Sequence, residues 1–214
     1  MNDLLEYMVH NYARIWTLLI QHLLLTLSTL GIALVIAVPV GLFLNRYKWI
    51  SVPVLSLLGI LYSIPSLAMY AFLIPLIGLG AKTAIVALVA YSQLILVRNV
   101  MVGFQSIDSA IIEAGRGMGL DAKALFVYIQ LPLALPLILG GLRLATVSTI
   151  GIATIAAWIN AGGLGVILFE GLYQNHMAKM LWGTIMVSVL AIAANQLLMA
   201  LERRMSRRAR GELV

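Results

Sequence analysis

Cysteine is absent from this chain, and charged side chains make up only 10% of it. Without cysteine there is no disulfide framework, no thiolate metal site and no cysteine nucleophile. A soluble domain is usually about a quarter charged, whereas this chain of 214 residues is 62% hydrophobic, with a mean hydropathy of +1.03. The composition excludes an ordinary soluble enzyme, a disordered chain and a nucleic-acid module, and it predicts a protein that lies mostly in lipid.

The short motifs of several enzyme classes are also missing. The sequence has no G-x-x-x-x-G-K-[ST] loop, no H-E-x-x-H site and no G-x-S-x-G nucleophile. The run from Gly115 to Gly119 lacks the third glycine of a dinucleotide loop, because Leu120 stands in that place. His10 and His22 have no partners at metal-ligand spacing, and we interpret both as polar interface residues. We therefore expect no catalytic site, no metal and no cofactor in this chain.

Five stretches are apolar and long enough to cross a bilayer, which takes roughly 20 residues of helix. The expected spans are residues 20–44, 54–76, 82–102, 134–158 and 180–201. Prolines interrupt the second stretch, so the alternative there is a span followed by a short broken segment. The fold class that follows is an all-α membrane protein.

The basic residues predict an orientation. Five spans place the two termini on opposite sides of the membrane. The larger group of basic residues falls on one side: Arg46, Lys48, Arg98, Arg116, Lys123, Arg203, Arg204, Arg207, Arg208 and Arg210. Only Arg14, Lys82 and Lys179 fall on the other side, and Arg143 lies within the fourth span. Because cytoplasmic loops are rich in Lys and Arg, we expect the C-terminus in the cytoplasm and the N-terminus outside.

Three segments are expected from this pattern. Residues 1–16 carry an apolar face and a polar face at helical spacing, which predicts a short helix in the outer interface. The alternative for them is a soluble helix that caps the bundle. Residues 17–202 form the membrane domain, and residues 203–214 form a basic cytoplasmic tail. Such a tail anchors on anionic lipid, or alternatively senses salt.

A loop at about residues 103–133 is too long for a simple turn between spans. Asp108 or Ser109 can cap a first helix, in which Glu113 and Arg116 are spaced as an ion pair. Gly119 fits the left-handed residue that ends this helix. Asp121 then caps a second helix, whose apolar face is expected to hold three residues: Leu125, Tyr128 and Ile129. An ordered, apolar loop predicts a docking partner, and the alternative is packing on its own spans.

Within this loop, the spacing of Glu113-Ala114-Gly115, Gly119 and Ile129-x-Leu131-Pro132 resembles the EAA signature of ABC importer permeases. Gly115 departs from the signature, which usually has a second alanine; we expect this small-for-small exchange to preserve close packing. The resemblance implies a MetI-like core and a coupling helix that contacts a cytoplasmic ATPase. Under it, residues 113–119 form the contact, and Ile129, Leu131 and Pro132 tie the contact to the fourth span.

Further segments resemble the osmoprotectant branch of these permeases: residues 64–68, 77–80, 97–99, 117–119 and 161–165. This resemblance implies import of a solute such as glycine betaine, carnitine or choline. It also implies partner ATPase subunits that use ATP and Mg, an external binding protein and a second permease subunit. The alternatives are an ABC importer for another solute such as an amino acid, a subunit that transports nothing, or a secondary transporter.

Small residues recur every four positions in the fourth span: Gly141, Ala145, Thr149, Ala153, Ala157 and Ala161. Such spacing lets helices approach closely in lipid. The seam lies near the transport path or between two permeases, or it is a contact within the chain. Hydroxyl and amide groups of this span line a wet path or bond their own helix: Thr146, Ser148, Thr149, Thr154 and Asn160. Four aromatic residues are available for a cation cage or for packing: Tyr62, Tyr70, Tyr91 and Trp158.

Overall fold

The computed structural model describes residues 2–209, and for residues 2–5 it describes the backbone alone. Every regular element in this part of the chain is helical. In chain order the elements are α1 (Asn2–Arg46), α2 (Lys48–Ser63), α3 (Ser66–Ile77), α4 (Ala81–Gln105), α5 (Ser109–Gly117), α6 (Ala122–Leu125), the π-helical turn η1 (Phe126–Gln130), α7 (Leu131–Ile155), the 3₁₀ turn η2 (Ala156–Ile159), α8 (Gly165–Tyr173) and α9 (Met177–Ala209).

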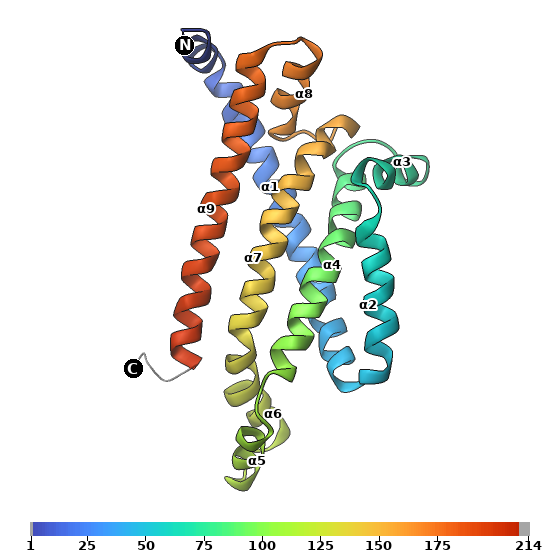
Figure 1. The fold of residues 1–214 in the computed structure, drawn as a ribbon, viewed down its shortest axis with the longest axis vertical. Coiled ribbons are helices and arrows are strands. Elements are labelled where there is room, and N and C mark those ends of the chain that lie inside the picture. Colours follow the sequence, from blue (N-terminus) through green and yellow to red (C-terminus); the bar gives the residue numbers. More distant parts are fainter. Residues whose placement is uncertain (1, 210–214) are drawn as a thin grey trace.

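The long helices α1, α4, α7 and α9 lie along the longest axis of the molecule, and α2 runs beside α4 (Figure 1). The short helices α3 and α8 lie at one end, while α5 and α6 project from the other end. The N-terminus is at the end that holds α8, and α9 finishes at the end that holds α5. The two ends of the described part, Asn2 and Ala209, therefore lie at opposite ends of the bundle, as an odd number of spans requires.

The described residues hold four helices that are long and apolar enough to span a membrane, or five spans if the bent pair α2–α3 is one. The two helices of this pair meet at an angle of 95°. The expectation of one continuous span over residues 54–76 is wrong, and the split that the prolines suggested is correct. Ile64 is extended, with ψ 127°, because Pro65 disfavours a helical conformation in the residue before it.

Within the expected segment 1–16, residues 2–16 are helical, but they do not form a separate element, since α1 continues without a break to Arg46. Its expected apolar face is divided. Ile15 is buried against Leu164 and Ile167, whereas Tyr12 and Trp16 are exposed. The location of this segment in the membrane interface stays a prediction. At the other end of the chain, residues 203–209 of the expected tail continue α9, and residues 210–214 lie outside the described part.

The core is centred on α4. Ala84, Ala87 and Leu88 are fully buried in one cluster, and Leu96 and Val97 are buried in a second one. In contrast, the only buried residues of α9 are Ala178 and Gly183 in its first two turns. Most of α9 therefore lies on the outside of the bundle, with its apolar side chains half-buried or exposed.

Candidate functional site

The loop between α4 and α7, residues 106–130, forms an elbow at the end of the bundle (Figure 1). Its two short helices begin at the caps that the sequence predicts. The Asp108 carboxylate accepts a hydrogen bond from the Ala110 N–H at 2.9 Å, so Asp108 rather than Ser109 caps α5. The Asp121 carboxylate accepts from the Ala124 N–H at 2.7 Å. Each cap satisfies a backbone donor that the first helical turn leaves unpaired.

Gly119 has the left-handed conformation expected at the end of α5, with φ 84°. The Leu120 N–H donates to the Gly115 carbonyl at 3.2 Å, and the Gly119 N–H donates to the Arg116 carbonyl at 2.9 Å. These two bonds define a Schellman motif. An L side chain at this position would strain the backbone, so the direction in which the chain leaves α5 depends on this glycine.

Gly115, where the EAA signature usually has alanine, is buried against the second half of the elbow. A Cβ at this position would lie 2.7 Å from the Cδ1 atoms of both Leu125 and Ile129. The exchange is therefore not simply small for small. Because Gly115 has no side-chain methyl group, the side chains of Leu125 and Ile129 can pack against it and hold α5 against α6 and η1.

The outer surface of the elbow is exposed. Glu113 and Ala114 lie on it, and Met118 and Tyr128 each expose 74% of their surface. The expected ion pair of Glu113 with Arg116 is not among the salt bridges of the described residues. Tyr128 was expected beside Leu125 and Ile129, but the wider π-helical turn η1 rotates it away from their face.

The elbow is joined rigidly to two long helices. The rings of Phe104 at the end of α4 and Phe126 in η1 stack with centroids 5.6 Å apart and an angle of 8° between their planes. Ile129 is half-buried, and Leu131 and Pro132 begin α7 with their side chains exposed. Because α6, η1 and α7 continue into one another, a force on the elbow passes directly to α7.

The small residues of α7 lie against α4 of the same chain. A Cβ on Gly141 would be only 2.3 Å from the Asn99 Cβ, and the hydroxyls of Thr149 and Ser92 are 3.1 Å apart. Ala145 and Ala153 are fully buried in the clusters that α4 organises. Ala157 and Ala161 are half-buried. Residues 141–153 of this stripe thus form a helix seam within the chain.

A different face of α7, continued by Trp158 in the turn η2, is open. Leu144 and Trp158 expose 53% and 52% of their surface, and a Cβ on Gly151 would meet nothing within 4 Å. Together with Leu137, these residues recur every seven positions. Reasoning from the sequence overlooked this face, although its period of seven was a signal for it.

Two of the four hydroxyls considered for a wet path bond their own helix. Thr146 donates to the Leu142 carbonyl at 2.7 Å, and Thr154 donates to the Gly151 carbonyl at 2.7 Å. Ser148 is half-buried, and Asn160 has a left-handed conformation, with φ 63°. Of the two alternatives, the structure thus shows hydrogen bonds within the same helix for Thr146 and Thr154.

Three of the aromatic cage candidates pack together beside the α2–α3 break. The rings of Tyr62 and Tyr91 meet edge to face at 6.2 Å, and Tyr70 is fully buried in the same region. The Tyr91 hydroxyl donates to the Ile64 carbonyl at 2.7 Å. This bond satisfies a carbonyl that the break at Pro65 releases from the helix, so Tyr91 has a structural role.

At the opposite end of the molecule, the loop of residues 160–165 is held by α1. Gln21 accepts a hydrogen bond from the Gly163 N–H at 3.1 Å. The His22 Nδ1 accepts from the Leu164 N–H at 3.3 Å, while its Nε2 donates to the Ile150 carbonyl at 3.2 Å. Since His22 is fully buried, its expected role as a polar interface residue is wrong. No local pattern in the sequence shows which loop this histidine meets.

Two ion-pair groups connect helices near the two ends. At the end that holds α8, Glu170 pairs with Arg14 of α1 and lies 4.0 Å from the Lys179 Nζ. At the other end, the Arg143 Nε donates to Glu202 at 2.9 Å, and its guanidinium also donates to Asn195 at 3.1 Å. Arg143 therefore spans from α7 to α9 with its charge compensated.

These features define an all-helical, multi-pass membrane protein with a rigid, exposed elbow at one end. Residues 16–210 match the family of binding-protein-dependent transport system inner membrane components, and the chain belongs to this family. It is thus an inner-membrane transport subunit, which works with a binding protein and with an ATPase that uses the ATP.

Similar proteins span nearly the whole chain. The osmoprotectant import permease protein OsmW of Salmonella typhimurium is 38% identical over 94% of this chain and 95% of its own length. The carnitine transport permease protein OpuCB of Listeria monocytogenes is 38% identical, covering 88% of this chain and 87% of its own. The glycine betaine/carnitine/choline permease protein OpuCB of Bacillus subtilis is 34% identical, with 96% and 95% covered.

Solved structures show the same fold. A chain of the MetNI methionine ABC transporter in an inward-facing conformation superposes with a TM-score of 0.79 at 23% identity, covering 89% of this chain and 95% of that one. A chain of an amino acid ABC transporter superposes with a TM-score of 0.73 at 20% identity, covering 92% and 97%. The expected MetI-like core is thus confirmed as a fold.

Proposed function

We propose that this chain is the permease subunit of an ATP-driven importer for osmoprotectants such as glycine betaine, carnitine or choline. The observation that carries the proposal is its similarity, at 34% to 38% identity, to three permeases named for these solutes. The charge of α7 fits it as well, because Arg143 is paired with Glu202 and leaves no unpaired positive charge on this helix to repel a cationic solute.

Uptake measurements test the solute. The chain is expressed with its ATPase and binding protein in a strain that lacks osmoprotectant importers, and uptake of labelled glycine betaine, carnitine, choline and methionine is compared. We expect ATP-dependent uptake of at least one of the first three. Uptake of methionine alone, or uptake that persists after ATP depletion and collapses with the ion gradient, would overturn the proposal.

The elbow is the docking surface for the ATPase in this proposal. Its exposed side carries Glu113, Ala114, Met118 and Tyr128. Its inner side is closely packed around Gly115. A surface that is rigid and exposes large apolar groups suits a groove on a partner protein. Motion of the ATPase would then be transmitted through η1 to α7.

A single cysteine tests this contact, because the chain has none of its own. Ala114→Cys is expected to cross-link to the ATPase, whereas Ala81→Cys, also exposed but at the opposite end of α4, is expected not to. Cross-linking of Ala81→Cys, or none from Ala114→Cys in an intact complex, would remove the elbow from the interface.

We propose that the end carrying the elbow is cytoplasmic. Four basic residues of α9 gather there: Arg203, Arg204, Arg207 and Arg208. Arg46 and Lys48 lie at the same end, where α1 passes into α2 (Figure 1). In this orientation the N-terminus is outside. A thiol reagent that cannot cross the membrane should label Ala81→Cys but not Ala114→Cys in intact cells.

We propose that the open face of α7 lines the transport path or contacts the second permease subunit. Because the small-residue seam is occupied by α4, the surface free for these roles is the one around Leu144, Gly151 and Trp158. We expect Gly151→Leu to impair uptake strongly. Gly31→Leu on α1, where the added side chain also starts in open space, is the control and should retain uptake.

A further inference from the structure

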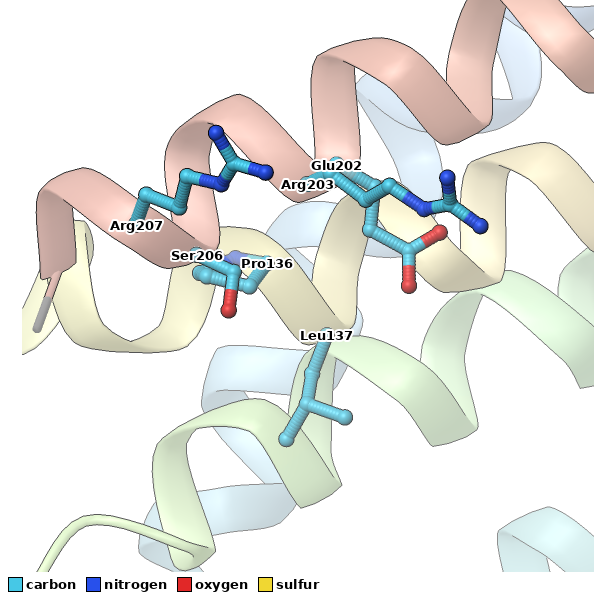
Figure 2. A pocket seen from close by; sticks show the side chains of 6 residues that line it. All are labelled: Pro136, Leu137, Glu202, Arg203, Ser206 and Arg207. Atoms are coloured by element: carbon cyan, nitrogen blue, oxygen red, sulfur yellow. The ribbon is translucent and has the colours of Figure 1, made fainter.

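A cleft of about 450 Å³ opens between α7 and α9 at the end of the bundle that carries the elbow. Pro136 and Leu137 line it from α7. Four residues line it from α9: Glu202, Arg203, Ser206 and Arg207 (Figure 2). The cleft therefore combines an apolar wall on one helix with a basic and hydroxyl-bearing wall on the other.

The charge of this cleft is positive. Its carboxylate, Glu202, is already paired with Arg143 at 2.9 Å, and that guanidinium is further held by Asn195. Across the described residues, no salt bridge involves Arg203 or Arg207; Arg203 donates only to the Met199 sulfur, at 3.4 Å. Both guanidinium groups remain available for an anion.

The charge pattern of α9 indicates where the cleft lies relative to the membrane. Residues 180–201 carry no charged side chain, and as a helix they rise about 33 Å, enough to cross the hydrocarbon layer of roughly 30 Å. Glu202 and Arg203 follow at once. The cleft consequently begins where the apolar layer ends, at the level of the lipid headgroups.

We propose that this cleft binds the phosphate of an anionic phospholipid headgroup. Arg203 and Arg207 are one helical turn apart and therefore lie on the same side of α9, where both can donate to one phosphate. Ser206, which lies beside Pro136, supplies a hydroxyl donor on the same wall of the cleft (Figure 2). Pro136 and Leu137 face the apolar part of the lipid. The site lies beside the Arg143–Glu202 pair, so an occupied cleft adds a second bridge between α7 and α9.

Native mass spectrometry of the purified complex tests the site. Phosphatidylglycerol and phosphatidylcholine with identical acyl chains are offered in equal amounts. We expect preferential retention of phosphatidylglycerol, and a loss of about ten-fold or more in Arg203→Gln/Arg207→Gln. The matched control is Arg204→Gln/Arg208→Gln, which removes the same charge from the same helix outside the cleft, and it should retain the lipid within about two-fold.

Three results would overturn the proposal. Equal losses in the two double variants would mean diffuse attraction to the basic helix rather than a site. Equal retention of the two lipids would remove the requirement for an anion. Displacement of the lipid by millimolar inorganic phosphate would assign the cleft to a soluble phosphate instead. The assay reads binding without transport, so its failure is distinct from a failure of the proposed import function.

Discussion

The loop of residues 160–165, which we call the outer loop after the orientation that we propose, and the elbow of residues 106–130 each contain a left-handed residue that ends a helix, but their surroundings differ. Asn160 ends η2 and Gly119 ends α5, each as the left-handed residue of a Schellman motif. The outer loop is then fastened to α1 by Gln21 and His22. In the elbow, α5 packs on the second half of the elbow itself, Phe126 stacks on Phe104 of α4, and the other side stays exposed.

This difference indicates that the outer loop holds the bundle together, whereas the elbow is a surface for contact with a partner. Changes in the outer loop should act on the stability of the bundle, because the loop shares buried hydrogen bonds with another helix. Changes in the elbow should act mainly on transport, because much of its surface has no partner within this chain. Four substitutions, ordered from the largest expected effect on stability to the smallest, test this separation.

Gly165→Ala should have the largest effect. A Cβ at this position would lie 1.9 Å from the backbone carbonyl oxygen of Thr154, and backbone cannot yield as a side chain can. We expect a loss of about 3 kcal/mol or more, measured as a lower melting temperature in detergent. Gly151→Ala, which meets nothing within 4 Å, is the control, and an equal loss there would contradict the steric explanation.

His22→Ala should follow. The substitution leaves a cavity in the core and removes the acceptor of the buried Leu164 N–H. An unpaired buried donor costs about 1–3 kcal/mol, and the cavity adds to this loss. His10→Ala on the same helix is the matched control, because His10 is exposed. Similar melting temperatures for the two variants would show that the loop is not held by His22.

Gly119→Val should reduce stability less and uptake more. A non-glycine residue in the left-handed region costs roughly 1–2 kcal/mol, and nothing lies within 4 Å of a Cβ there. We expect the protein to reach the membrane while uptake is lost, since the chain can no longer leave α5 in its present direction. Gly119→Asn is the control, because asparagine tolerates the left-handed region, and it should keep most uptake. Normal uptake by Gly119→Val would refute the coupling role.

Gly115→Ala should have the smallest effect, about 1 kcal/mol, because the two atoms that a methyl group would meet are the ends of flexible side chains. Ile129→Val removes one of these atoms. The double variant should therefore melt closer to the wild type than Gly115→Ala alone. If Ile129→Val deepened the loss instead, close packing would not be the reason for glycine at this position.

Several features were predictable because they depend on neighbouring residues in the chain. The helix caps at Asp108 and Asp121 and the left-handed Gly119 are properties of short segments. The break at Pro65 was visible as an alternative, but its angle of 95° was not. The exposure of Tyr128 was missed because a π-helical turn changes which residues share a face.

The amino-acid sequence by itself determined which segments are apolar and long enough to span a membrane, where the two helices of the elbow begin, and that an ordered elbow joins two long helices. These properties follow from apolar length, from charge and from bonds between residues a few positions apart. Only the tertiary structure decided that Gly141 and Thr149 face α4, that His22 holds the outer loop, and that Arg143 meets Glu202. Each of these contacts joins residues far apart in the chain, so it depends on how the helices pack.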